Sequence, residues 1–338
     1  MTTPRTPRWI TLGRLALSAM LILLSACDGR HGGASPNGSG AQVLRVASQR
    51  GATRALMEAS GVLKGAAYKV EWSEFAAASP LLEALGANAV DVGGVGDAPF
   101  VFAYAAGAPI KAVLAYDSGA RGTSTALVAA AASPVRTVAD LKGRKVATVK
   151  GSIGHFLLLK LLEKAGLGSK DVQVVFLDPG AARGALSSGS IDAWATWSPY
   201  IGLVTLHDNA RIVADGQGVL DGVGFFAASD KAIADKSPIL SDFLVRLTRA
   251  QAWAAGHQDA YGAVLAKDTG LPLDVARDAA RRLAGQAEPI DANLIRKEYA
   301  TLETFRRAGV IEATPKIDGA FAPRLSQAAL AAAGPVGH

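Results

Sequence analysis

The chain has 338 residues, of which 50% are hydrophobic and 19% are charged. This length suffices for one large or two ordinary domains, and the composition excludes a mostly disordered chain. The net charge of +6 includes three arginines before residue 15, so the rest of the chain carries only a small, scattered positive excess. Nucleic-acid binding needs basic residues gathered on one face, and we expect no nucleic-acid partner.

Residues 1–26 have the pattern of a bacterial export signal. Three arginines precede an apolar run at 15–24, which is shorter than the roughly 20 residues that a membrane-spanning helix needs. Leu24-Ser25-Ala26-Cys27 resembles the lipobox of bacterial lipoproteins, and the resemblance makes Cys27 the lipidated first residue of the mature chain. The alternative is an ordinary cleaved signal with an incidental cysteine.

Residues 27–42 are rich in glycine and serine and poor in apolar residues, which is typical of a flexible tether. A lipid on Cys27 would hold the folded body near a membrane surface. The expected location is therefore the periplasmic side of a bacterial membrane.

From Val43 onward, short β-rich runs alternate with helical patterns, which predicts an α/β protein with parallel-rich sheets covered by helices on both faces. After about residue 228 the pattern is almost wholly helical, and no strand is predicted there. The expected strands cover 43–47, 68–75, 89–92, 110–116, 125–130, 145–149, 172–177 and 192–196. Long helices are expected near 241–257, 273–284 and 292–308.

The sequence carries no catalytic, nucleotide-binding or metal-binding motif. Cys27 is the single cysteine, so a disulfide within the chain and a cysteine-based metal site are excluded. The five histidines lack H-E-x-x-H spacing, and the glycines at 93–96 run into Asp97 without completing G-x-G-x-x-G. Gly-x-Ser-x-Gly is also absent. We expect no metal, no cofactor and no enzymatic activity.

Small or polar loops follow five of the expected strands at the points where helices begin. In an open parallel sheet, ligands bind at the carboxyl ends of the strands, and free N–H groups at helix starts attract anions. Converging loops of this kind predict an anion pocket. Each loop also suits a simple helix cap, with Ser79, Asp97 and Ser152 as capping residues. The loops lie at 49–53, 78–80, 96–99, 150–152 and 178–180.

Several segments, in their order and spacing, resemble the aliphatic-sulfonate-binding proteins of bacterial ABC transporters, within the sulfonate, taurine and nitrate group of binding proteins. The resemblance spans residues 43–283. The segments are VEWSEF at 70–75, GDAP at 96–99, ADLKGRKVA at 139–147, KGS at 150–152 with His155, VFL at 175–177 and DAW at 192–194.

The resemblance implies a two-lobed periplasmic-binding-protein fold, type II-like, with two hinge crossings. Lobe 1 would comprise residues 43–119 and 216–338, and lobe 2 residues 120–215. It further implies a monomeric, lipid-anchored, non-enzymatic component of an ABC importer. Such a protein captures a small anionic ligand, an alkyl or aryl sulfonate, between the lobes and delivers it to a permease in the membrane.

The resemblance also implies the ligand-binding residues. The sulfonate would be held by Gln49, Gly96, Asp97, Gly151 and Ser152, and the organic group would meet Trp197 and Tyr200. An ionised Asp97 would repel an anion. We therefore expect it to orient its loop, cap its helix or accept a hydrogen bond from an amine on the ligand. Arg50 either adds charge at the mouth or is solvated, and His155 either faces the cleft or is solvated. Trp72 and Trp194 are assigned to the core.

Some positions depart from the family pattern, notably Ser48 and Ser198, which replace larger side chains near the expected ligand. These departures favour a roomier cleft for a bulky sulfonate. The same fold could instead bind taurine, nitrate or a pyrimidine precursor of thiamine. The alternative of a different class is a periplasmic hydrolase that uses Ser152.

Overall fold

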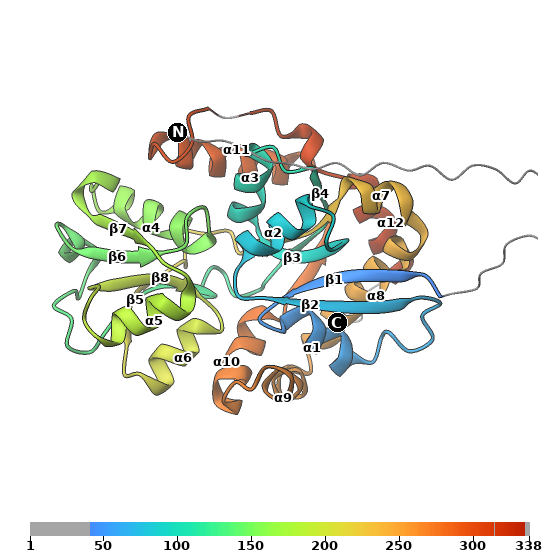
Figure 1. The fold of residues 1–338 in the computed structure, drawn as a ribbon, viewed down its shortest axis with the longest axis horizontal. Helices are drawn as coiled ribbons and strands as arrows, with labels where there is room; N and C mark the ends of the chain where they lie inside the picture. The colour runs from blue at the N-terminus through green and yellow to red at the C-terminus, as the bar shows by residue number, and fades with distance from the viewer. Residues whose placement is uncertain (1–40, 314, 335–338) are drawn as a thin grey trace, which may run out of the picture. The chain divides into compact units, whose positions relative to one another are not determined.

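The computed structural model describes residues 41–313 and 315–334, which form two helix-flanked sheets. The predicted signal, Cys27 and nearly all of the tether lie outside the described residues. The first sheet has the strand order β11-β4-β10-β3-β1-β2 and the second β7-β6-β8-β5-β9 (Figure 1). No helix in the described ranges has the length and apolar character of a membrane span.

The strands of the first sheet are β1 (Val43–Gln49), β2 (Lys69–Phe75), β3 (Val92–Gly96), β4 (Ile110–Asp117), β10 (Val223–Ser229) and β11 (Gln286–Glu288). Those of the second are β5 (Thr125–Ala129), β6 (Lys145–Thr148), β7 (Gln173–Phe176), β8 (Ala193–Trp197) and β9 (Arg211–Asp215). The helices are α1 (Ala52–Ser60), α2 (Ala78–Gly86), α3 (Asp97–Ala105), α4 (Ile153–Lys164), α5 (Pro179–Ser187), α6 (Tyr200–His207), α7 (Asp230–Asp235), α8 (Ser237–Ala254), α9 (Gln258–Thr269), α10 (Leu273–Leu283), α11 (Ala292–Arg307) and α12 (Pro323–Ala333).

Both sheets are mixed and combine parallel β-α-β units with antiparallel strands. The β-α-β units pair in parallel, as β1 does with β2 and β3, and as β6 does with β7 and β8. The strands β10 and β5 run antiparallel to both of their neighbours within the sheet, and β11 runs antiparallel to β4. The antiparallel strands are those that lie next to the connections between the two sheets or that return from the C-terminal helices.

The structure differs from the strand prediction at four places. The strand expected at 89–92 instead runs from Val92 to Gly96, and the Gly93 backbone packs so closely on β1 that an added Cβ would lie 2.8 Å from the Ala47 Cβ. Strands β9, β10 and β11 were not predicted. Pairing within the sheets, and not local residue preference, forms the glycine-rich β3 and the three-residue β11.

Two segments, 118–124 and 216–222, connect the sheets, and they press against each other at two glycines. Gly122 has φ = 87°, and a Cβ added there would lie 2.2 Å from the Gly216 carbonyl oxygen. The Gly216 N–H donates to the Thr125 carbonyl oxygen at 3.0 Å, which fixes one segment to the start of β5. The contact leaves no room for a side chain, so both the conformation and the close approach require glycine.

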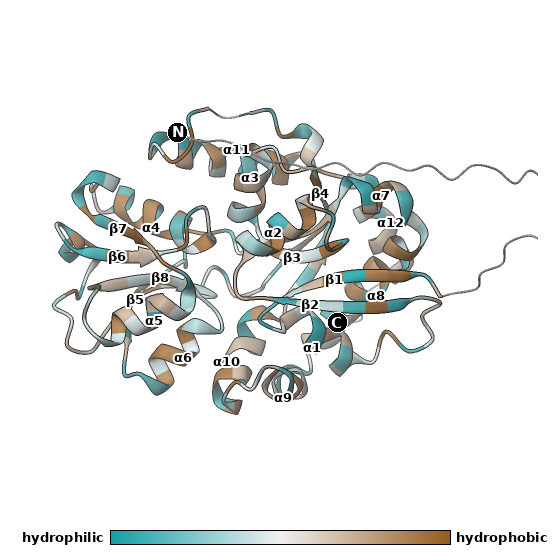
Figure 2. Cartoon of the chain, viewed as in Figure 1, coloured by the Kyte–Doolittle hydropathy of each residue, from teal (hydrophilic) through white to brown (hydrophobic). Residues whose placement is uncertain are grey.

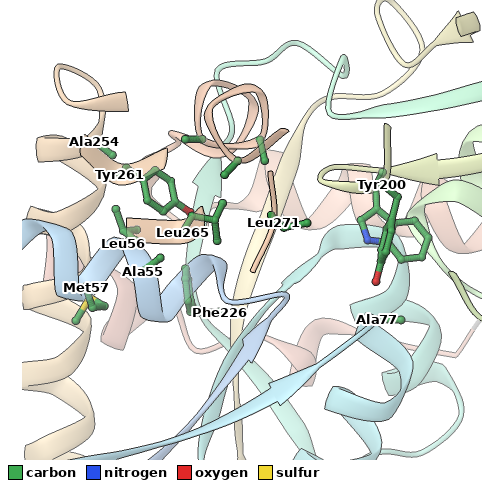
Figure 3. Packing of buried hydrophobic residues seen from close by; sticks show 14 of the residues in the cluster. Ala55, Leu56, Met57, Ala77, Tyr200, Phe226, Ala254, Tyr261, Leu265 and Leu271 are labelled. Carbon is green, nitrogen blue, oxygen red and sulfur yellow. The ribbon is translucent and has the colours of Figure 1, made fainter. Parts of the chain in front are cut away.

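Hydrophobic residues, brown in Figure 2, run along β1 and β7, and the helices cover the sheets. Figure 3 shows Leu56 of α1 near Tyr261 and Leu265 of α9, while Met57 lies on the other side of α1. The Tyr261 hydroxyl donates to the Ala52 carbonyl oxygen at 3.0 Å, so α9 also holds the start of α1. This packing fixes the position of a helix start that is part of the site described below.

Helix α11 packs against α3 and against α4 (Figure 1), so it contacts the helices of both sheets. The Phe305 ring lies 5.3 Å from that of Phe102 and 5.7 Å from that of Phe156, measured between centroids. At the end of α11, Arg307 forms an ion pair with Glu163 at 3.0 Å. We call each sheet with its flanking helices a half of the molecule. Helix α11 therefore joins the two halves independently of the connecting segments.

We predict that Gly122→Ala lowers the free energy of unfolding by about 2 kcal/mol or more beyond the loss caused by Gly143→Ala. Gly143 has a comparable φ of 74° with nothing within 4 Å of an added Cβ, so this control carries the backbone strain without the clash. Urea unfolding of both variants measures the difference. Equal losses would show that the two connecting segments do not press together in solution.

Candidate ligand-binding site

A cavity of about 150 Å³ lies between the two sheets and is lined by residues from both. The first sheet and its helices contribute Gln49, Asp97 and Tyr116, and the second contributes Ser152 and Trp197. Small-molecule sites typically occupy roughly 300–1,000 Å³, so this cavity suits a small charged group with a short chain.

Five helices begin at or next to this cavity, which Ala52 and Thr53 of α1, Ala78 of α2, Asp97 of α3 and Ile153 of α4 all line. The fifth is α6, which begins two residues after a further lining residue, Ser198. Helices α1, α2, α3 and α6 have no side-chain hydrogen bond at the N-cap. The first N–H groups of a helix have no acceptor within it, and the helix dipole places partial positive charge there. Together the helix starts give the cavity the character of an anion site.

Three buried polar atoms on the cavity wall have no hydrogen-bond partner within residues 41–313 and 315–334: Trp197 Nε1, Ser198 Oγ and Gln251 Oε1. Their side chains are only 4–6% exposed. An unpaired buried polar atom costs about 1–3 kcal/mol, so protein interiors rarely keep one without a reason. A ligand with acceptor oxygens would satisfy Trp197 Nε1 and the Ser198 hydroxyl, whereas Gln251 Oε1 needs a donor.

Asp97 is buried at the start of α3, and its Oδ1 accepts the Ala98 N–H at 2.6 Å. Burial raises the pKa of Asp97 to about 7, and the charge of Asp221 adds to the effect. Near neutral pH this carboxyl is therefore partly protonated, and the cavity does not face a full negative charge.

The loop at 150–152 is held by its own helix. Ser152 Oγ accepts the His155 N–H at 3.1 Å and so caps α4, while His155 Nδ1 accepts the Gly151 N–H at 3.2 Å. Burial lowers the pKa of His155 to about 4, with a further contribution from Lys150. The ring is neutral and orients the loop, and the Ser152 hydroxyl is engaged as a cap, which argues against the hydrolase alternative.

The structure brings five of the nine predicted binding residues to the cavity wall and four to its surroundings. Gln49, Gly96, Asp97, Ser152 and Trp197 line the cavity, whereas Arg50, Gly151, His155 and Tyr200 do not. The role of all nine in binding stays a prediction. Trp194 is fully buried, and Trp72 packs at the edge of the core.

Arg50 and Tyr200 form a contact across the two halves beside the cavity. The Arg50 guanidinium carbon lies 5.6 Å from the centroid of the Tyr200 ring, and the Tyr200 hydroxyl donates to the Ala76 carbonyl oxygen at 2.8 Å. Since Tyr200 begins α6 and the other two residues belong to the first half, these contacts hold the halves together.

Sequence reasoning missed Gln251 and Tyr116 as cavity residues. Gln251 follows Leu244 and Leu247 on the buried stripe of α8 and precedes Ala254 on it. A polar residue within an apolar stripe was the available signal. Tyr116 lines the cavity because of its position on β4, and the sequence around it has no comparable polar residue within an apolar stripe.

A second hollow of about 680 Å³ adjoins the first, and Pro99 lines both. Its walls include Leu82, Phe102, Phe176 and Lys150. This groove has the larger free volume of the two hollows, and the expectation of a bulky organic group stays a prediction. Within the described part of the chain, no cluster of three metal-ligating side chains occurs.

We predict that the stability lost between pH 6.5 and 4 is smaller in His155→Gln than in the wild type. The folded pKa of His155, about 4, lies below its unfolded value, so the unfolded chain binds more protons in this range and stability falls with falling pH. The full effect corresponds to about 3 kcal/mol. Urea unfolding at pH 7 and pH 4.5 measures it, with His207→Gln, at an exposed ion pair with Asp274, as the control. Equal pH dependence in wild type and His155→Gln would contradict the assignment.

Two helix-flanked sheets with a cavity between them are the architecture of two-lobed ligand-binding proteins, the fold class that the sequence predicted. A family profile described as NMT1/THI5 like matches residues 60–261. A protein of Escherichia coli K12, provisionally named aliphatic sulfonates-binding protein, is 34% identical over 271 residues, which cover 79% of this chain and 84% of the relative. The chain belongs to the NMT1/THI5-like family, in agreement with the resemblance found in the sequence.

Solved structures of related proteins confirm the fold class. The alkanesulfonate-binding protein of Xanthomonas axonopodis pv. citri, bound to MOPS, has a TM-score of 0.77 at 32% identity, over 84% of this chain and 99% of that one. The periplasmic aliphatic sulphonate binding protein of Escherichia coli has a TM-score of 0.71 at 31% identity, over 81% and 90%. These relatives are binding proteins, as expected for a non-enzyme. The desulfurization enzyme DSZB, at 17% identity and a TM-score of 0.62, over 86% and 99%, shares the fold alone.

Proposed function

We propose that this protein is the sulfonate-binding component of a bacterial ABC importer, which captures an organosulfonate in the cavity and presents it to a permease. The names of the relatives support this class of ligand, and one of them was solved with MOPS, itself a sulfonate. The observation that carries the proposal is the cavity wall, where helix starts without a side-chain N-cap meet Trp197 Nε1 and Ser198 Oγ, two atoms that have no hydrogen-bond partner in the described part of the chain.

A sulfonate matches this wall chemically. It is ionised at every physiological pH and offers three acceptor oxygens but no donor, so its site needs N–H and O–H groups. Trp197 Nε1 donates only, and the Ser198 hydroxyl rotates to donate. Charge-assisted hydrogen bonds of this kind are about twice as strong as neutral ones.

In this proposal Gln49, Gly96, Asp97 and Ser152 surround the headgroup. Gly151 and His155 set the loop that carries Ser152, and Arg50 and Tyr200 close the mouth. The organic group, alkyl or aryl, extends past Pro99 toward the adjoining groove. Each buried methylene contributes about 0.8 kcal/mol, so the groove selects among chain lengths.

The proposed lobes are residues 43–119 with 216–338, and residues 120–215, with the hinge at the two connecting segments. Binding would close the lobes, and the closed form is what a permease distinguishes from the open one. The protein would act as a monomer in the periplasm.

We predict that ethanesulfonate binds with a micromolar dissociation constant, which corresponds to about 8 kcal/mol. Trp197→Phe and Ser198→Ala should each weaken binding about tenfold or more, because each removes a donor to an ionised oxygen. Ser198→Ala should raise the free energy of unfolding of the ligand-free protein by about 1 kcal/mol or more, since its buried hydroxyl has no partner in the described structure and its removal relieves that cost. Titration calorimetry measures affinity and urea unfolding measures stability.

Two variants outside the cavity serve as controls for this titration. Trp253→Phe changes a tryptophan stacked on His257, and Ser188→Ala changes an exposed serine bonded to Ser190. Both should bind as the wild type does. Tight binding of nitrate, taurine or a thiamine pyrimidine without any response to alkanesulfonates would overturn the headgroup assignment in favour of that ligand.

We further propose that the mature protein is anchored through a lipid on Cys27, on the basis of the lipobox-like Leu24-Ser25-Ala26-Cys27. The full chain expressed in a Gram-negative host should incorporate radiolabelled palmitate and sediment with membranes. Cys27→Ser should abolish the label, because the thiol is the only acceptor in the sequence. Labelling that persists in Cys27→Ser, or a wild type without label, would refute the anchor.

A further inference from the structure

Two buried carboxyls lie at or near the cavity, and the proposed function assigns no role to Glu298 and no protonation state to Asp97. Asp97 lines the cavity at the start of α3, and Glu298 lies on α11, which packs against α3. Glu298 is 1% exposed, and its Oε2 is buried without a hydrogen-bond partner among the described residues. A buried carboxylate oxygen with no donor is strongly disfavoured, whereas a protonated carboxyl avoids most of that cost.

The surroundings of this pair carry little compensating positive charge. The cation nearest to it, Lys297 on α11, is paired with Asp221 at 3.3 Å. Strands β3 and β10, which also pack on α3, have no titratable side chain. Other titratable groups on elements around α3 include Tyr116 of β4, the neutral His155 of α4 and Glu83 of α2, which lines the separate groove. The remaining charged side chains of α4 and α11 lie toward the surface, where Lys160 and Arg307 pair with Glu163 and Arg306 pairs with Glu303.

Burial is the main cause that keeps both carboxyls protonated at higher pH than usual. It raises the pKa of Asp97 to about 7, with the charge of Asp221 adding, and it raises the pKa of Glu298 well above its usual range, with Asp97 and Asp221 adding. Asp97 raises the pKa of Tyr116 in turn, after burial itself. An anion in the cavity would act on Asp97 in the same direction.

We propose that the Asp97–Glu298 carboxyl pair couples ligand binding to proton uptake, with neutral Asp97 donating its O–H to an oxygen of the bound sulfonate. This inference rests on the proposed function and assigns to the same site a protonation requirement. One proton moves from solvent to the pair when a sulfonate binds to the ionised form, and no bond of the ligand changes. A neutral carboxylic acid kept in an apolar site for this purpose is an established device in enzymes.

The test is titration calorimetry of ethanesulfonate into the mature protein at pH 6, 7 and 8, in bis-Tris, imidazole and Tris buffers. The buffers differ in ionisation heat, so the buffer dependence of the binding heat counts the protons exchanged. Sulfonate buffers are unsuitable because they would compete. We expect uptake that approaches one proton at pH 8 and vanishes near pH 6, together with an affinity that falls up to tenfold between pH 7 and 8.

Two variants separate this coupling from a structural role of the carboxyls. Asp97→Asn keeps a donor of similar shape, so its affinity should become independent of pH and its proton uptake should vanish. Glu298→Gln removes a neighbouring acid, so the pH range of the coupling should move downward. The control is Asp230→Asn, an exposed carboxyl paired with Lys111, which should match the wild type.

Each outcome decides a different question. Sulfonate binding with no proton exchange at any pH would overturn the inference and leave the proposed function standing. Proton release would overturn it too, since it would mean that ionised Asp97 meets a cationic group. Absence of sulfonate binding at every pH would overturn the proposed function itself. If Asp97→Asn fails to fold, the wild-type proton count and the shift in Glu298→Gln still decide the matter.

Discussion

The binding site depends on one constraint, namely that hydrogen-bond donors from both halves are desolvated around one small cavity. Four helices without a side-chain N-cap begin at or next to it, and the Trp197 indole N–H and the Ser198 hydroxyl of its wall have no partner among the described residues. Each unpaired buried group costs about 1–3 kcal/mol. A folded chain keeps such an arrangement when another molecule supplies the acceptors. In our proposal the acceptor binds between the halves, because the donors come from both, and ligand binding is thereby connected to their relative position.

The contacts between the halves are arranged so that they do not occupy those donors. The halves meet through the Gly122–Gly216 backbone contact, through Tyr200 against Ala76, and through Phe305 of α11 against α3 and α4. The aromatic and backbone contacts are apolar or neutral, and even the Arg50 charge rests on an aromatic face. Two ion pairs also join the halves, Arg307 with Glu163 and His207 with Asp274, but none of these four residues lines the cavity.

The sequence predicted the β-α-β units and the loops at 96–99 and 150–152, because alternating strand and helix patterns with small residues at strand ends are local signals. It could not predict β10 and β11, whose pairing brings together residues far apart in the chain. For the same reason the approach of Glu298 to Asp97 was invisible, since α11 reaches α3 only through the tertiary fold. Gln251 had a local signal, a polar residue on an apolar stripe, that went unused.

An ionised Asp97 would repel a bound anion, but a protonated Asp97 can help to select one. In its neutral form it is one more donor to the oxygens of a headgroup. A phosphate monoester or a protonated acid brings an O–H that needs an acceptor on the wall, and Gln251 Oε1, which has no partner among the described residues, is one such acceptor. A fully ionised sulfonate has no such requirement. In our proposal, neutral Asp97 therefore favours acceptor oxygens on the headgroup, whereas Gln251 favours a donor elsewhere on the ligand.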